Sequence, residues 1–207
     1  MKSVRCLLAC LAYCLSGNLL AQDVPAAVQN NCARCHGLDG IAKQPSMPHL
    51  NGQLDSYLLA AMKKLQKGRS PTEVANHVPE SLPESELAAI AHHYQAVKAT
   101  RPIQETDPDK VVRGEIVFRN RCNDCHGDNG READKDAPLM AGQDLQHLLK
   151  QIRLFVGGKR RFGFLQDDAF KGQSLEDLDA VAHFFASQDP VATQVSVNNS
   201  GKKKQRR

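Results

Sequence analysis

The sequence lacks three features that would define other classes of protein. No segment alternates apolar and polar residues over the length of a β-strand, which leaves a helical fold. The apolar run over residues 6–15 is too short to span a bilayer. The formal net charge of +4 falls to about −3 once Lys2, Arg5 and the five basic residues among the last six are set aside. A basic fold that binds nucleic acid is therefore not indicated.

Cysteine is also scarce in the part of the chain that would remain after removal of an export signal. Residues 1–21 have the pattern of a secretory signal peptide, with two basic residues, the apolar run and the small residue Ala21 at the expected cleavage point. Export would place the mature protein in the periplasm. Three of the seven cysteines lie in this segment, so four remain, at positions 32, 35, 122 and 125.

Those four cysteines belong to two copies of one motif, Cys-Ala-Arg-Cys-His at residues 32–36 and Cys-Asn-Asp-Cys-His at residues 122–126. Cys-x-x-Cys alone also occurs in redox dithiols and zinc sites, but the histidine that follows indicates covalent attachment of haem c. In each copy two thiols would form thioethers with one haem, and the histidine would be the proximal ligand of its iron. No thiol is left for a disulfide or a zinc site. The sequence thus predicts two covalent haem c groups, with Cys32, Cys35 and His36 at haem 1 and Cys122, Cys125 and His126 at haem 2.

The rest of the chain repeats around these motifs. Each motif is followed by Gly-x-x-Gly, by a Pro-x-x-x-Gly-Gln segment and by two further apolar stretches. We assign residues 22–99 to a first domain and 110–189 to a second, joined by a polar linker with two prolines at 100–109. Residues 190–207 have few large apolar side chains and end in basic residues, so we expect a disordered basic tail.

The apolar stretches predict helices. Their apolar residues recur at the spacing of one helix face, and Ser174 with Asp177 gives a capping-box pattern before the last stretch. The expected helices cover residues 54–65, 84–97, 145–155 and 175–186. Each domain has under about 90 residues, too few for a generous core alone. The predicted fold class is therefore all-α, with three or four helices packed round each covalent haem.

These repeats resemble the diheme cytochromes of the c4 type, which are built from two class I cytochrome c domains. The resemblance rests on the two haem motifs, the Gly-x-x-Gly segments, the Pro-x-Leu-x-Gly-Gln segments and the aromatic residues of the closing helices. It covers nearly the whole mature chain except the basic tail. It implies two tandem class I domains with His36 and His126 as proximal ligands. It also implies a backbone carbonyl near Pro48 and near Pro138 that accepts the imidazole Nδ1–H.

The resemblance also implies a function, the carrying of single electrons in the periplasm between redox proteins such as a dehydrogenase, an oxidase or a reductase. Nothing else in the sequence resembles a catalytic apparatus, so we expect an electron-transfer protein rather than an enzyme. A subunit bound permanently to a larger dehydrogenase would have the same chemistry. The basic tail offers peripheral contact with a membrane or an acidic partner, and a solubilising end is the alternative.

The distal sides of both haems depart from the family. A methionine shortly before the last helix usually binds the iron there, but Val78 and Ala169 occupy the matching places. The three methionines of the mature chain lie elsewhere. Met62 is on an apolar helix face, and Met47 and Met140 stand beside the prolines on the proximal side.

Other side chains are therefore needed as distal ligands. His77, one residue before the expected position, is the candidate at haem 1, and a solvated loop histidine is the alternative. Residues 157–173 contain no histidine or methionine, which leaves Lys171 as the candidate at haem 2. A lysine binds iron only when it is deprotonated in a buried site. An open iron at haem 2 would permit another function, ligand binding or catalysis on peroxide or a sulfur compound.

Overall fold

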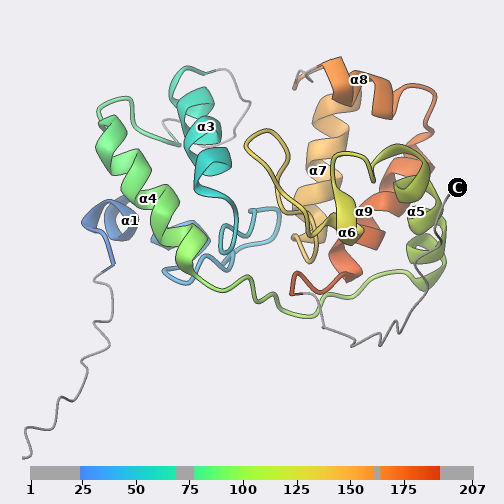
Figure 1. Ribbon diagram of the computed structural model, residues 1–207, viewed down its shortest axis with the longest axis horizontal. Helices are drawn as coiled ribbons and strands as arrows, with labels where there is room; N and C mark the ends of the chain where they lie inside the picture. Colours follow the sequence, from blue (N-terminus) through green and yellow to red (C-terminus); the bar gives the residue numbers. More distant parts are fainter. Residues whose placement is uncertain (1–23, 69–76, 161–163, 192–207) are drawn as a thin grey trace, which may run out of the picture.

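The helices of the chain form two units that lie side by side (Figure 1). The computed structural model describes residues 24–68, 77–160 and 164–191, with no strand among them, and the all-α prediction is confirmed. The predicted signal peptide, residues 1–21, and all but the first two residues of the predicted tail lie outside this description. Within it, no helix is long and apolar enough to cross a bilayer.

The first unit is built on two of the predicted helices. α3 (Asp55–Gln66) packs against α4 (Glu84–Ala96), while α1 (Ala26–Asn31) packs against α4 and against the single turn α2 (Ala33–His36). Met62 is buried in this unit, which confirms its predicted place in the core. The core consists of Ala27, Val28, Leu58, Met62, Leu87, Ile90, Ala91 and Tyr94.

The second unit repeats the plan with a longer first helix. α5 (Pro108–Arg121) crosses α9 (Leu175–Ser187) so closely that a Cβ on Gly114 would collide with the backbone of Ala180. α7 (Leu145–Val156) packs on the other side of α9, and α6 (Gly127–Gly130) and α8 (Phe164–Phe170) are short. The core consists of Val117, Phe118, Leu145, Leu148, Leu149, Ile152, Leu178, Val181, Ala182, Phe184, Phe185 and Ala186.

Local signals account for where two helices begin. The Ser174 hydroxyl accepts from the Asp177 amide and the Asp177 carboxylate accepts from the Ser174 amide, which confirms the capping box before α9. α5 starts at Pro108, inside the segment predicted as linker. The reason is that the Asp107 carboxylate accepts from the next two free amides and Pro108 suits the first helical position.

The segment between α4 and α5 runs along both units and is bonded to each (Figure 1). Buried Asn51 of the first unit donates to the carbonyls of Lys98 and Thr100, both at 2.9 Å. Further along, Gln104 donates to the Gln143 carbonyl at 3.0 Å, and the Leu145 amide donates to the Gln104 side chain at 2.8 Å. The segment predicted as a linker therefore fixes the two units through hydrogen bonds.

The two Pro-x-x-x-Gly-Gln segments meet between the units. The Gln53 side chain donates to the Leu139 carbonyl at 2.7 Å and accepts from the Leu139 amide at 2.9 Å. The Gln143 side chain donates to the His49 carbonyl at 3.0 Å and accepts from the His49 amide at 2.7 Å. Each glutamine thus pairs with both backbone groups of the residue that follows the proline in the other unit.

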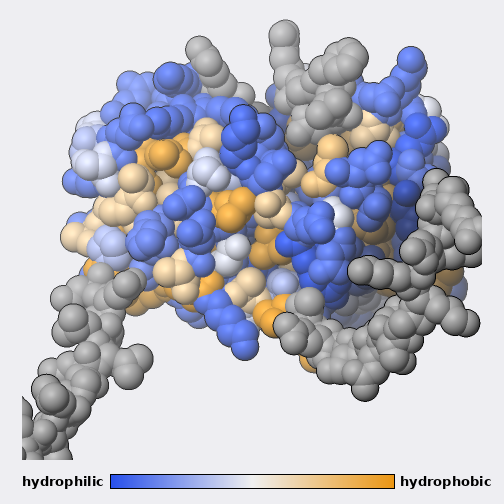
Figure 2. All heavy atoms as spheres, in the orientation of Figure 1, coloured by the Kyte–Doolittle hydropathy of each residue, from blue (hydrophilic) through white to orange (hydrophobic). Residues whose placement is uncertain are grey.

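Large apolar side chains on the surface are scattered. On the face seen in Figure 2, apolar residues form small patches among hydrophilic ones. The exposed large hydrophobic residues of the described ranges come from both units and from the segment between them: Leu38, Ile103, Val112, Ile116, Val156, Leu175 and Val191. Isolated apolar residues of this kind are ordinary on a soluble domain and do not by themselves indicate an interface.

Candidate haem sites

Each Cys-x-x-Cys-His motif folds into one helical turn that brings its three functional groups together. The His36 amide donates to the Cys32 carbonyl at 3.0 Å, and the His126 amide donates to the Cys122 carbonyl at 2.9 Å. In both motifs the second cysteine also donates its amide to the carbonyl of the first, at 3.2 Å. The local backbone of the two motifs is therefore the same, with two thiols and an imidazole on one turn.

All four cysteines are free thiols; three are partly buried and Cys125 is exposed. Burial raises the pKa of Cys32 and of Cys122 to about 11, with the neighbouring Cys125 adding to the effect at Cys122. These thiols stay protonated at neutral pH. None of the four cysteines forms a disulfide, so each has a free sulfur for the thioether bond to a haem vinyl group.

The His36 imidazole is held in the orientation expected of a proximal ligand. It is 6% exposed, and its Nδ1 lies 3.0 Å from the Pro48 carbonyl, as predicted. That hydrogen bond fixes the ring and leaves Nε2 for a metal. Burial lowers the pKa of His36, against an opposing contribution from the Pro48 carbonyl, so the imidazole is neutral as a ligand must be.

The second imidazole is only partly buried and is bonded differently. Burial lowers the pKa of His126, and the nearby Pro138 carbonyl partly opposes this. His126 Nδ1 nevertheless forms no hydrogen bond within the described residues, so the predicted bond to a carbonyl near Pro138 is not made. Its ring packs instead against Phe185, with ring centres 6.0 Å apart at 71°.

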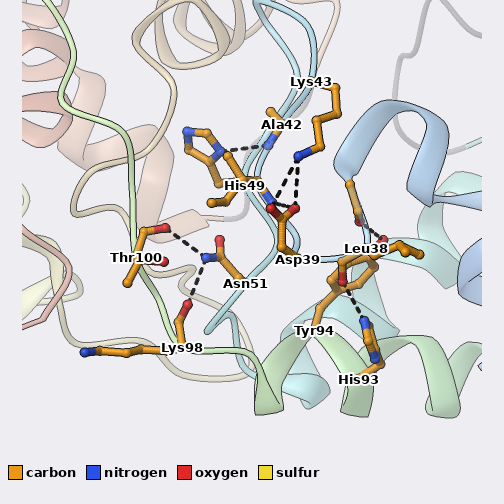
Figure 3. Close-up of polar contacts among 12 residues, drawn as sticks. Leu38, Asp39, Ala42, Lys43, His49, Asn51, His93, Tyr94, Lys98 and Thr100 are labelled. Carbon is orange, nitrogen blue, oxygen red and sulfur yellow. Dashed lines mark hydrogen bonds and ion pairs between the residues drawn. The ribbon is translucent and has the colours of Figure 1, made fainter. Parts of the chain in front are cut away.

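A set of polar contacts supports the turn that follows His36 (Figure 3). The buried Tyr94 hydroxyl donates to the Gly37 carbonyl at 3.0 Å, and His93 Nε2 lies 2.8 Å from the Leu38 carbonyl. Two residues after the Gly-x-x-Gly segment, the Ala42 amide donates to His49 Nδ1 at 3.0 Å. Helix α4 and the segment that contains His49 therefore hold the backbone of the Gly-x-x-Gly segment and of the residues directly after it.

His77 is brought to the first motif by the folding of the chain. Its ring centre lies 5.9 Å from that of His36, and the two ring planes are 84° apart. The side chain is partly buried, and burial lowers its pKa, which favours the neutral imidazole. Val78, at the position of the family's methionine, packs against the core of the first unit.

The structure gives no such support to Lys171. Its side chain is exposed just after the end of α8, whereas a lysine that binds iron must be buried to lose its proton. Met140 packs against the core of the second unit. In the part of the chain that the structure describes, no second imidazole forms a ring contact with His126. The distal sides of the two sites are therefore unlike.

Both sites fit a covalent haem. Each combines two free thiols and an imidazole of lowered pKa on one turn of backbone, and each sits against a separate apolar core. Two such sites in tandem all-helical units define a c-type cytochrome with two haems.

Comparison with known proteins gives the family. The family model described as cytochrome c matches residues 21–98. Cytochrome c4 of Pseudomonas aeruginosa is 30% identical over 154 residues, which cover 70% of this chain and 74% of that protein. The crystal structure of reduced recombinant cytochrome c4 from Pseudomonas stutzeri superposes with a TM-score of 0.66 and 25% identity, over 80% of this chain and 98% of that one. The chain belongs to the cytochrome c4 family, and it is a diheme electron-transfer protein with two covalent haem c groups.

A relative with a more specific name is also similar. The thiosulfate dehydrogenase electron acceptor of Stutzerimonas stutzeri is 25% identical over 175 residues, which cover 79% of this chain and 80% of that protein. The same two-unit sequence pattern is thus found in a protein named for accepting electrons from a dehydrogenase.

Proposed function

We propose that the protein is exported to the periplasm, where it carries single electrons between redox proteins. The observation that carries the proposal is the pairing of two similar haem sites through reciprocal hydrogen bonds between the units. A bound haem supplies a one-electron change at its iron, and the protein holds the haem, excludes water and sets its potential. Each unit does this with its own core and its own motif.

The residues that hold the haems follow from the two motifs. Cys32 and Cys35 would form the thioethers of haem 1, with His36 as the proximal ligand of its iron. Cys122, Cys125 and His126 would do the same for haem 2. Residues 22–99 and 110–189 would be the two haem domains, extended by the start of α5 at Pro108.

A dehydrogenase is one class of electron donor that fits this function. The supporting observation is the similarity to a protein named as a thiosulfate dehydrogenase electron acceptor. A donor that delivers electrons one at a time to either unit needs no substrate site on this chain. A terminal oxidase or reductase would complete the transfer on the other side.

The test is expression with the bacterial haem-attachment system, followed by cell fractionation and mass spectrometry. We expect the periplasmic protein to begin at Gln22, to carry the mass of two haems and to take up two electrons per chain in a reductive titration. The Cys32→Ala/Cys35→Ala variant should lose one haem and one electron equivalent. A protein found only in the cytoplasm, or one without attached haem, would contradict the proposal.

A second candidate function is the binding of a small ligand, or catalysis on peroxide or a sulfur compound, at haem 2. It is favoured by the exposure of Lys171, the candidate distal ligand of that haem. The reduced protein would then bind one equivalent of carbon monoxide, and Lys171→Ala would leave its spectrum unchanged. No binding of carbon monoxide would exclude this function, because an open iron(II) haem binds that ligand.

A further inference from the structure

We propose that His36 and His77 bind the iron of haem 1 from opposite sides, with their imidazole planes nearly perpendicular. This rests on the proposed attachment of haem 1 at Cys32 and Cys35. It adds a distal ligand where the family places a methionine, and it makes the two haems of the chain chemically different.

The distance between the rings suits a shared iron. A bond from a metal to an imidazole nitrogen is about 2 Å long, so two imidazoles on opposite sides of one metal have ring centres roughly 6 Å apart. The separation between His36 and His77 is 5.9 Å. The two rings in the folded chain therefore lie at the spacing that a shared iron requires.

The state of both rings suits the same role. His36 is fixed through Nδ1 by the Pro48 carbonyl, which leaves Nε2 as its metal-binding atom. His77 is partly buried and lies with its ring against that of His36.

The angle between the rings has its own consequence. With planes 84° apart, each imidazole would donate to a different one of the two iron d orbitals that lie perpendicular to the haem plane. Those orbitals then stay nearly equal in energy. Low-spin iron(III) in this state gives a highly anisotropic electron paramagnetic resonance signal with one very large g value, whereas parallel imidazoles give a less anisotropic one.

Among the described residues of the second unit, no imidazole forms a ring contact with His126. A haem with two histidines has a lower potential than one with histidine and methionine. Haem 1 would therefore be a low-potential centre relative to its methionine-ligated relatives, while haem 2 takes its potential from a different distal side.

The experiment begins with the unsubstituted holoprotein. Its frozen oxidised form should give the signal with a very large g value, and its visible spectrum should lack the weak long-wavelength band of a methionine–iron bond at haem 1. His77→Ala should abolish that signal and bind one more equivalent of carbon monoxide per chain in the reduced state. His92→Ala, an exposed histidine on α4, is the matched control and should change neither.

A second variant keeps the test independent of any loss of folding. His77→Ala/Val78→Met places a methionine at the family's position and should restore a six-coordinate haem 1 with a raised potential. Absence of the large-g signal in the unsubstituted protein, or a His77→Ala variant with unchanged spectrum and ligand binding, would overturn the inference. Two attached haems in either result would leave the proposed carrier function standing.

Discussion

The Tyr94 hydroxyl donates a hydrogen bond of 3.0 Å to the carbonyl of Gly37, the residue directly after the proximal histidine of the first site. Burial raises the pKa of Tyr94 well above the ordinary tyrosine value, so the hydroxyl remains a donor at all ordinary pH values. Phe185 occupies the same place in the second unit, where its backbone carbonyl accepts from Gly142 as that of Tyr94 accepts from Gly52. The first site therefore has a support that the second lacks.

Tyr94→Phe should destabilise the first unit, because it removes the hydroxyl donor of the buried Gly37 carbonyl and leaves only the longer bond from the Gly40 amide. Removing one partner of a buried hydrogen bond costs about 1–3 kcal/mol. Urea denaturation followed through the haem bands should show a lower midpoint. The His93→Ala variant, which removes a more exposed contact to the neighbouring Leu38 carbonyl, should cost less. Equal midpoints for Tyr94→Phe and the unsubstituted protein would show that this bond contributes nothing.

Gln143→Glu should weaken the contact between the units. Glutamate keeps the acceptor for the His49 amide but loses the donor to the His49 carbonyl, and it places a charge in a buried position. The expected loss of stability is about 2 kcal/mol or more. Gln53→Glu should have a similar effect, because it makes the same pair of bonds to Leu139.

The matched control for both glutamines is Gln146→Glu, because Gln146 is exposed. A weakened contact between the units should also separate their unfolding into two transitions, seen as different midpoints for the two haems. If Gln143→Glu unfolds in one transition at the same midpoint as Gln146→Glu, the glutamine does not couple the units.

Acid should weaken the same region of the molecule. His147 of the second unit lies with Nδ1 3.2 Å from the Ser46 carbonyl of the first, and burial lowers the pKa of His147 to about 4. The Ser46 carbonyl opposes this shift, while the positive charges of Arg160 and Lys150 add to it. Burial lowers the pKa of His49 to about 4 as well, with Arg101 adding to the effect.

The direction of the pH dependence follows from these lowered values. A histidine in the unfolded chain has a pKa of about 6.5. Above that pH both histidines are neutral in the folded and in the unfolded protein, so neither lowers the free energy of unfolding. Between about pH 6.5 and pH 4 only the unfolded state binds the proton, so each histidine lowers the stability by at most about 3 kcal/mol. His147→Gln should reduce the fall in urea midpoint between pH 7 and pH 5, and His92→Gln should not. An unchanged fall in His147→Gln would contradict this assignment.

Gly114→Ala should destabilise the second unit by overpacking. The added methyl group would meet the Ala180 backbone where α5 crosses α9, and neither helix backbone moves cheaply. Overpacking of this kind costs typically about 1–3 kcal/mol. Ile116→Ala, at a residue 60% exposed on the same helix, should change stability by less than about 0.5 kcal/mol. Thermal unfolding of the two variants would separate these outcomes.

Much of the fold was predictable because its signals are local. Helical spacing of apolar residues located α3, α4, α7 and α9 to within one residue at each end. α1 and α8 are too short to show a period, and α5 begins inside a segment whose prolines and polar residues indicated a linker. The motifs around His36 and His126 were equally readable, since all their groups lie within five residues.

The contacts between distant segments were not predictable in the same way. Gln53 and Leu139 are 86 positions apart, and nothing near either residue indicates that they meet. The repeated Gly-Gln dipeptide was the available signal, and it was interpreted only as part of a family pattern. The burial of Asn51 and the partial burial of Arg101 were also missed, because a polar residue does not by itself indicate burial. The facing of His77 and His36 likewise depends on how the loop between α3 and α4 closes.

The reciprocal contact of Gln53 and Gln143 has the form of an isologous interface, the kind that relates two copies of a symmetric homodimer. Each unit contributes both halves of the contact, a glutamine side chain and the backbone of the residue after a proline. The same surface of each unit therefore provides hydrogen-bond donors and acceptors to the other. A gene duplication that fused two such subunits would keep this dimer geometry inside one chain. The tether then makes pairing independent of protein concentration, and the two copies become free to diverge at their iron ligands while their mutual register is retained.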